Sequence, residues 1–209
     1  MAASILTLAR AHRAQTREKG SRFIATAIPV RDAEKARAAL DGVRREFPDA
    51  THHCWASVIQ EGRAEPEGRC DDAGEPSGTA GPPILQAIRG AELSNVIVVV
   101  TRYFGGTKLG KGGLARAYRA AAALALAGAS AVPAAPTDRV LISVPLLLDG
   151  EARHLVARHA GRVESASYDG AARSILRVTV PVEARGRLEG DLQALSKGDA
   201  LVRDLDETI

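Results

Sequence analysis

The sequence contains few of the residues that crosslink secreted domains and few of those that stack on nucleic-acid bases. It has two cysteines, Cys54 and Cys70, in 209 residues. Two thiols are too few for a disulfide framework or a cysteine-rich zinc site, so we expect both to be reduced. We predict no cofactor and assign no residue as a metal ligand. Phe, Trp and Tyr together make up 3% of the chain, which leaves few side chains for base stacking.

Long apolar runs and targeting signals are also missing. The apolar patch at residues 4–9 is too short for a signal peptide. The most apolar long stretch, Ala120 to Pro136, is mostly alanine with Gly and Pro, and is a poor membrane span. We therefore expect a cytoplasmic protein that does not associate with a membrane.

Acidic residues are absent from a long segment in the middle of the chain. No Asp or Glu occurs from Leu93 to Thr137, although five basic residues do. Residues 1–137 carry a net charge of +5 and residues 138–209 carry −2, which together give the overall +3. A basic face in the first part of the chain would attract anions.

The chain is long enough for two domains. With 209 residues, 45% of them hydrophobic, it can form one large or two small cores. The stretch GASAVPAAPT at 128–137 is uncharged and Pro-rich, which is typical of a linker. We predict a first domain over residues 1–130, a linker over 131–138 and a second domain over 139–209.

The order of elements in the second domain follows from its apolar periodicity. Strands are predicted at 139–148, 163–168, 174–182 and 201–205, and helices at 150–160 and 184–197. This β-α-β-β-α-β order is that of ferredoxin-like domains.

The first domain is predicted to be a sheet with helices packed on it, so the fold class is α+β. Strands are expected at 22–30, 52–59 and 95–103, a long loop at 60–80, and helices after Asp32 and at 84–91 and 114–129.

The glycine loop GGTKLGKGG, residues 105–113, resembles two nucleotide-binding motifs and matches neither. A P-loop requires Ser or Thr after Lys111, where this sequence has Gly112. A dinucleotide-binding turn follows its strand directly and is followed by a ribose-binding acid. Here the turn lies about eight residues beyond Arg102, and the next acidic residue is Asp138.

Two interpretations of the glycine loop remain open. Its backbone N–H groups and the N-terminus of the following helix could bind a phosphate-like anion, or the glycines could only permit a tight turn. The residues predicted to bind an anion or nucleic acid are Arg102, Tyr103, Gly105, Gly106, Lys108, Gly110, Lys111, Gly112, Gly113 and Arg116.

The acidic loop, residues 71–79, begins the stretch DDAGEPSGTAGPPIL at 71–85. Its three carboxylates, all within residues 71–75, could bind Mg²⁺, act as acid and base, or stay solvated. We favour a fourth reading, in which they pair with Arg102, Lys108 and Lys111 and hold the two loops together. Ser77 and Thr79 are candidate caps for the next helix. The residues predicted to line a cleft are His53, Asp71, Asp72, Glu75, Ser77 and Thr79.

The adjacent His52, His53 and Cys54 suggest a metal site only at first sight. In a strand, His52 and Cys54 face one way and His53 the other, so the three cannot bind one ion without distortion. One of the two histidines is expected to line a site.

Four segments in order resemble the IMPACT family, in its bacterial YigZ-like branch. They are SRFIA at 21–25, HHCWA at 52–56, DDAGEPSGTAGPPIL at 71–85 and VVVTRYFGGTKLGKGGLARAY at 98–118. Residues that match family motifs are His53, Asp71, Asp72, Glu75, Thr79, Arg102, Tyr103, Gly105, Gly106, Leu109, Gly110, Gly112, Gly113 and Tyr118.

The resemblance implies a first domain like domain 2 of ribosomal protein S5 and a second like the ferredoxin-like end domains of elongation factor G. Both similarities point to RNA or the ribosome as partner. Eukaryotic relatives regulate translation under amino-acid starvation through a kinase system that bacteria lack, so that partner does not carry over.

The function expected from the sequence is non-enzymatic association with nucleic acid or the ribosome, as a monomer or weak oligomer. A phosphate-containing ligand would bind at the glycine loop. The alternatives are an enzyme for a phosphorylated or nucleotide substrate, with Asp72 or Glu75 as base or metal ligand, and a protein-interaction adaptor.

Overall fold

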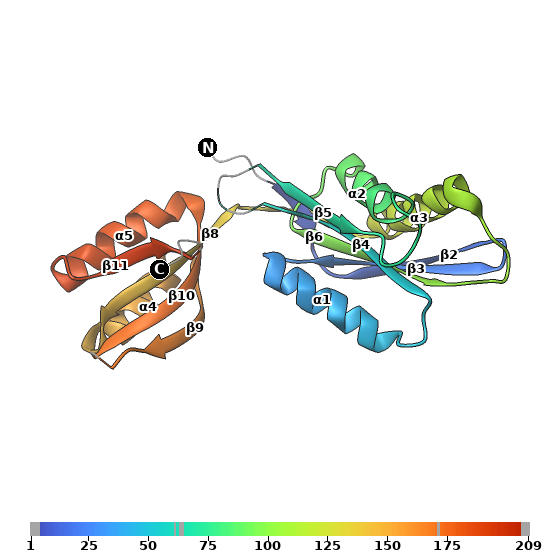
Figure 1. The fold of residues 1–209 in the computed structure, drawn as a ribbon. Helices are drawn as coiled ribbons and strands as arrows, with labels where there is room; N and C mark the ends of the chain where they lie inside the picture. The colour runs from blue at the N-terminus through green and yellow to red at the C-terminus, as the bar shows by residue number, and fades with distance from the viewer. Residues whose placement is uncertain (1–4, 61, 63–64, 171, 206–209) are drawn as a thin grey trace. The chain divides into compact units, whose positions relative to one another are not determined.

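The computed structural model describes residues 5–60, 62, 65–170 and 172–205. These residues form two compact units, each a mixture of helices and strands (Figure 1). The first unit comprises Ile5–Gln60 and Glu65–Ala134, and the second comprises Gly62 and the described residues from Ala135 onward. The fold is therefore a two-domain mixture of α and β structure.

The first unit contains a five-stranded antiparallel sheet with the strand order β2-β3-β6-β4-β5. Its strands are β2 (His12–Glu18), β3 (Ser21–Pro29), β6 (Val96–Tyr103), β4 (His52–Ile59) and β5 (Glu67–Asp71). The central strand β6 is buried over nearly its whole length because helices cover both faces of the sheet. This explains its unbroken run of β-branched residues.

Helices α2 (Gly81–Gly90) and α3 (Gly110–Ala127) cover one face of the sheet, and α1 (Ala33–Glu46) covers the other (Figure 1). Successive strand residues point to opposite faces. Val98 and Val100 accordingly pack in the core beneath α2 and α3, and Ile97 and Val99 pack against α1.

The start of α1 is as predicted. The Asp32 carboxylate accepts a hydrogen bond from the backbone N–H of Lys35 at 2.7 Å, which caps the first turn of the helix. Ala36, Leu40 and Val43 then form its buried stripe.

Four strands of the first unit were not predicted. The expected loop over 60–80 contains β5, and the expected linker over 131–138 contains β7 (Ala131–Ala134) and the start of β8 (Thr137–Pro145), a strand of the second unit. Strand β7 pairs with β1 (Ile5–Leu8), and β2 occupies an edge of the main sheet. These strands are short or largely exposed and lack a clear apolar alternation. Pairing with distant segments, rather than local pattern, defines them.

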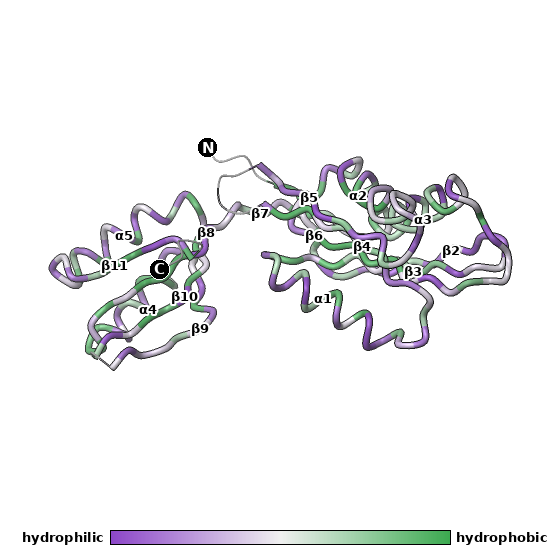
Figure 2. Tube along the Cα trace, viewed as in Figure 1, coloured by the Kyte–Doolittle hydropathy of each residue, from purple (hydrophilic) through white to green (hydrophobic). Residues whose placement is uncertain are grey.

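The second unit has a four-stranded antiparallel sheet with the order β11-β8-β10-β9. Its elements are β8 (Thr137–Pro145), a 3₁₀ turn (Leu146–Leu148), α4 (Asp149–Arg158), β9 (Arg162–Tyr168), β10 (Arg173–Pro181), α5 (Val182–Ser196) and β11 (Leu201–Asp204). Their chain order is the predicted one. The core combines alternate strand residues such as Ile142 and Leu176 with Val156 and Leu188 of the helices, and apolar strand segments are visible in both units (Figure 2).

Candidate functional site

The glycine loop connects β6 to α3 and touches the β2–β3 turn backbone to backbone. A Cβ atom on Gly105 would lie 1.9 Å from the carbonyl carbon of Gly20, so no other residue fits without moving the chain. The Gly105 N–H also donates to the Ser21 hydroxyl at 3.2 Å. Gly105 therefore has a structural role, which is to let the loop cross the hairpin.

At the start of α3, the backbone requires glycine at position 110 but not at position 112. Gly110 has a φ of +69°, a conformation that side chains disfavour. Gly112 has no such constraint, because a Cβ there would meet only the Arg116 Nη1 atom, at an ordinary contact distance of 3.5 Å. The helix itself begins without a side-chain cap, since Leu109 occupies the cap position. Its first N–H groups are thus left to solvent or a ligand.

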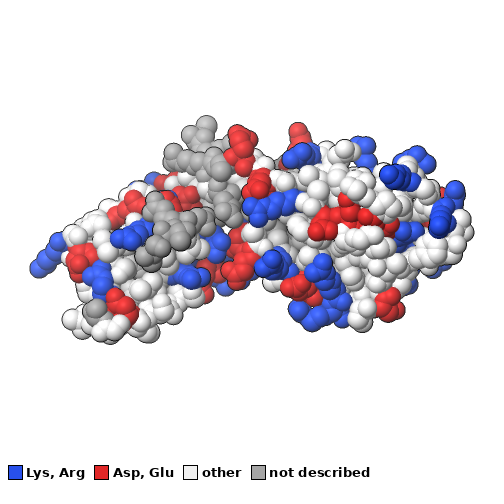
Figure 3. Space-filling model, in the orientation of Figure 1, with Lys and Arg blue, Asp and Glu red and all other residues white. Residues whose placement is uncertain are grey.

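The crossing of loop and hairpin gathers basic residues at one end of the first unit. The hairpin supplies Arg17 and Lys19, and the glycine loop and α3 supply Lys108, Lys111 and Arg116; all five are exposed, with Glu18 as an acidic neighbour. We call these five residues the basic end. Lys and Arg side chains are visible at this end of the first unit (Figure 3).

The acidic loop is a structural element rather than a set of free carboxylates. Asp72 accepts backbone N–H groups of Gly78 at 2.7 Å, Ala80 at 2.8 Å and Gly81 at 2.9 Å, which caps α2 from a distance. Burial opposes ionisation of this carboxyl, but the N–H donors outweigh it and lower the Asp72 pKa.

The predicted caps of α2 do not cap it. The Thr79 hydroxyl donates to the Pro76 carbonyl oxygen at 2.6 Å, and Ser77 is exposed on the loop. Asp71, also exposed, accepts the N–H of Ala73. Asp72 takes the capping role because the loop folds back on the helix, which spacing in the sequence did not show.

Glu75 and Arg102 form a buried ion pair beneath the glycine loop. Arg102 Nη1 lies 2.5 Å from Glu75 Oε1, and the two side chains are 6% and 3% exposed. The Tyr118 hydroxyl of α3 donates to the same oxygen at 2.7 Å, and Arg102 Nη2 lies 3.4 Å from the Ser21 hydroxyl. The predicted pairing between loops is therefore confirmed for Glu75 and Arg102. Among the described residues, Lys108 and Lys111 do not take part in it.

Cys54 extends this buried network. Its thiol lies 3.0 Å from the Asp72 carbonyl oxygen and 3.3 Å from the Tyr118 hydroxyl. Burial raises the pKa of the Cys54 thiol to about 12 and raises the pKa of Tyr118 as well. Both groups stay protonated and act as donors, so Cys54 is no nucleophile at neutral pH.

The two histidines lie on opposite faces of β4. His52 Nδ1 is 2.9 Å from the Ala73 carbonyl oxygen, and its Nε2 is 3.9 Å from Glu75 Oε1. His53, the histidine predicted to line the cleft, bonds Thr101 on the α1 face, where burial lowers its pKa. His52 therefore joins the Glu75 network and His53 does not.

Tyr103, one of the residues predicted to bind an anion, is engaged by neighbouring side chains. Its hydroxyl donates to Asp49 at 2.8 Å, and the Arg22 guanidinium stacks on its ring at 4.2 Å. The next residue, Phe104, is 49% exposed. Its ring also lies over the Arg102 guanidinium, 5.5 Å from centroid to Cζ, so Phe104 is the more exposed of the two aromatic residues but is not without a contact.

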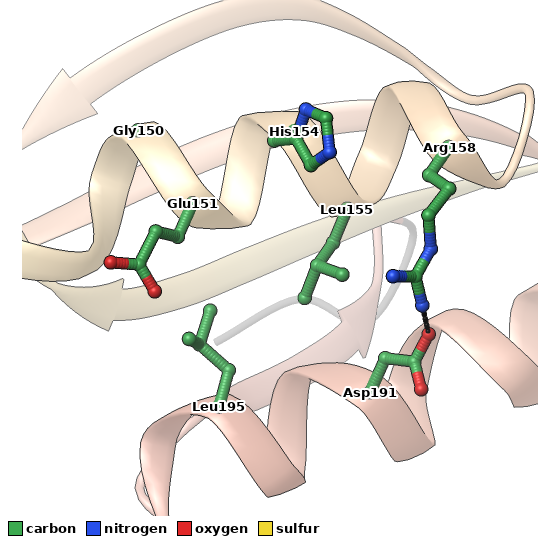
Figure 4. Close-up of a pocket in the computed structure, with 7 residues that line it drawn as sticks. All are labelled: Gly150, Glu151, His154, Leu155, Arg158, Asp191 and Leu195. Atoms are coloured by element: carbon green, nitrogen blue, oxygen red, sulfur yellow. Dashed lines mark hydrogen bonds and ion pairs between the residues drawn. The ribbon is translucent and has the colours of Figure 1, made fainter.

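The second unit contains a hollow, but the described residues show no metal cluster and no membrane-spanning helix. In the second unit, a hollow between α4 and α5 is bordered by Glu151, His154 and Leu195, with an ion pair of Arg158 and Asp191 across one side (Figure 4). Within the described ranges, no three His, Cys, Asp or Glu side chains cluster so as to hold a metal ion. No helix there is long and apolar enough to cross a membrane.

Tyr118, Ser21 and His52 complete the site but were not predicted as site residues. All three lie inside the motif segments that resemble the IMPACT family, and His52 is adjacent to the histidine that was chosen. Gly20 gave no signal of its own, because its role depends on the crossing with Gly105.

Comparison with known proteins agrees with these motifs. The family model for the Impact N-terminal domain matches residues 19–126. The IMPACT family member YigZ of Escherichia coli is 31% identical over 189 residues, which cover 90% of this chain and 92% of that protein. An IMPACT family member of Haemophilus influenzae is 45% identical over 100 residues, 48% of each chain.

A solved structure described as a hypothetical protein is similar over both units. It is 30% identical, covers 98% of each chain and has a TM-score of 0.69. Because the Impact N-terminal domain spans more than half of the sequence and the YigZ match spans nearly all of it, this chain belongs to the IMPACT family.

Proposed function

We propose that this protein associates with RNA or the ribosome without catalysing a reaction, and that it contacts phosphate groups through its basic end. The observation that carries the proposal is the crossing of Gly20 and Gly105, which brings two basic segments together beside the uncapped start of α3. Cationic side chains and free helix N–H groups together favour an anionic ligand.

Gly112 supports this proposal. Glycine lowers helix stability relative to alanine, and packing does not require it at this position. Gly112 lowers helix stability and is not needed for packing. Its presence is explained if the backbone at this position has to approach a ligand closely.

The scarcity of free aromatic rings indicates which part of RNA is contacted. Phe104 is half-exposed with Arg102 over its ring, and Tyr103 is engaged by Asp49 and Arg22. One ring offers little base stacking, so recognition would depend on the phosphate backbone. Such binding releases counterions and weakens steeply with salt.

The acidic loop supports binding over catalysis. The enzymatic alternative requires Asp72 or Glu75 as a base or metal ligand. Asp72 caps α2 and Glu75 neutralises Arg102, so each carboxylate already has a structural task.

A link to translation rests on family and fold. We assign the first unit to the ribosomal protein S5 domain 2-like fold and the second to the ferredoxin-like fold of elongation factor G end domains. The β-α-β-β-α-β order and the antiparallel order β11-β8-β10-β9 support the second assignment. A role as a translation regulator is consistent with both.

The proposal is tested by filter binding of tRNA, rRNA fragments and unstructured single strands over a range of salt. The double variant Lys108→Ala/Lys111→Ala should bind RNA more weakly, and the slope of log K against log salt should fall by about 1 to 2. The matched control, Arg177→Ala/Arg187→Ala, removes two exposed charges from the second unit and should leave binding unchanged. Equal binding by both double variants refutes the proposal.

Gly112→Asp separates binding from folding. A carboxylate in the first turn of α3 favours the helix dipole and should not lower stability. It would repel phosphate, so RNA affinity should fall although the protein remains folded. Unchanged affinity would exclude the start of α3 from the contact.

A further inference from the structure

A second candidate site lies on the opposite face of the first unit's sheet. A hollow of about 540 Å³ is bounded by α1 on one side and the edge strand β5 on the other. Its floor includes Trp55 and Ser57 of β4 and Ile97 of β6. The volume is in the range of small-molecule sites.

The floor of this hollow contains polar groups without partners. Ser57 is 2% exposed, yet its hydroxyl has no hydrogen-bond partner among the described residues. The same holds for the indole N–H of half-buried Trp55. Both residues line the hollow, so their polar groups can pair with a ligand bound there.

The two walls each present one charge that is free of ion pairs among the described residues. Arg37 lies on the α1 wall, and Asp71 lies on the β5 wall directly across from Trp55 in the strand register. The other arginines of the lining, Arg44 and Arg69, have carboxylate partners on their own elements. The two walls thus carry a cation, Arg37, and an anion, Asp71, whose only hydrogen bond among the described residues is the one that its Oδ1 accepts from the Ala73 N–H.

We propose that this hollow binds a small zwitterion with an aromatic or apolar side group, the chemistry of a free α-amino acid. The Arg37 guanidinium would hold the ligand carboxylate with paired N–H donors. Asp71 and the Ser57 hydroxyl would accept hydrogen bonds from the ammonium group, and the apolar group would pack on the Trp55 indole. This site is independent of the RNA contact, because it lies on the other face of the sheet from α3.

The test uses a fluorescent reporter that the chain already contains. Trp55 is its single tryptophan, so a change in tryptophan emission reports directly on this hollow. L-phenylalanine, which carries both charges, should change the emission in a saturable way. Phenethylamine lacks the carboxylate and 3-phenylpropionate lacks the ammonium group, and each should bind at least about tenfold more weakly.

Variants on the two walls test the residue assignments. Arg37→Ala should abolish the advantage of L-phenylalanine over phenethylamine, and Asp71→Asn its advantage over 3-phenylpropionate. The control Arg45→Ala removes an exposed charge from the same helix outside the hollow and should bind like the wild type. Unchanged emission with all three ligands, or equal binding of all three, would overturn the proposal.

Discussion

The glycine loop and the acidic loop are both dense in glycine and charge, but they differ in where their polar groups point. In the acidic loop, Asp72 and Glu75 turn inward, to the N–H groups of α2 and to Arg102. In the glycine loop, Lys108 and Lys111 are exposed and the helix start is uncapped.

The two loops therefore have different roles: one stabilises the structure, and the other is free to bind a ligand. Charged groups that satisfy one another define a conformation, and groups that remain exposed can meet a ligand. The buried network links the two loops, because Glu75 comes from one and its partners Arg102 and Tyr118 flank the other. The acidic loop therefore holds the glycine loop in place.

The strongest test of this comparison is Glu75→Ala. It would leave Arg102 charged, buried and unpaired, which should destabilise the protein by about 3–5 kcal/mol. Denaturant unfolding measures the change. In the control Glu67→Ala, the lost partner Arg69 is exposed, and little change is expected. Similar stabilities of both variants would mean that the network does not support the fold.

Gly105→Ala tests the crossing of loop and hairpin. The added methyl group would overlap the Gly20 backbone, so we expect a loss of about 1–3 kcal/mol. Gly112→Ala adds the same methyl group where there is room and should be neutral or slightly stabilising. The comparison fails if thermal unfolding ranks the two variants in the reverse order.

Asp72→Asn tests the distant cap of α2 and has a defined pH dependence. Loss of the cap charge should cost about 1–2 kcal/mol at neutral pH. The pKa of Asp72 is lowered by folding, so its stabilisation is present above the unfolded value of about 3.9 and is lost as pH falls through the folded value. The wild type and the variant should therefore converge in acid. A difference that is constant across pH would exclude the charge as its cause.

The smallest effect on stability is expected for Lys108→Ala/Lys111→Ala. Both side chains are exposed, so the unfolding midpoint should not change measurably even where RNA binding does. A lower midpoint would indicate that the lysines belong to the structural network after all.

Local pattern predicted most of the main elements. The β-branched run of β6, the Asp32 cap and buried stripe of α1, and the β-α-β-β-α-β order of the second unit follow from periodicity and capping. Short strands were missed, because β5 and β7 are defined by partners far away in the chain.

Contacts between distant residues also limited how much of the candidate site could be predicted from the sequence. The sequence indicated two unusual loops and a pairing between them, and the pair of Glu75 and Arg102 confirms that pairing. It did not indicate that Asp72 rather than Ser77 or Thr79 would cap α2, nor that His52 rather than His53 would lie beside Glu75. Both outcomes depend on how the acidic loop folds back.

The sequence by itself determined the glycine and charge content of the two loops, the exclusion of both nucleotide motifs, and the family. Only the tertiary structure decided which charges are occupied and which are free, because that depends on contacts between residues as distant as Gly20 and Gly105 or Glu75 and Tyr118. The sequence shows which charged residues are present, but folding decides which of them have a partner and which remain free to bind a ligand.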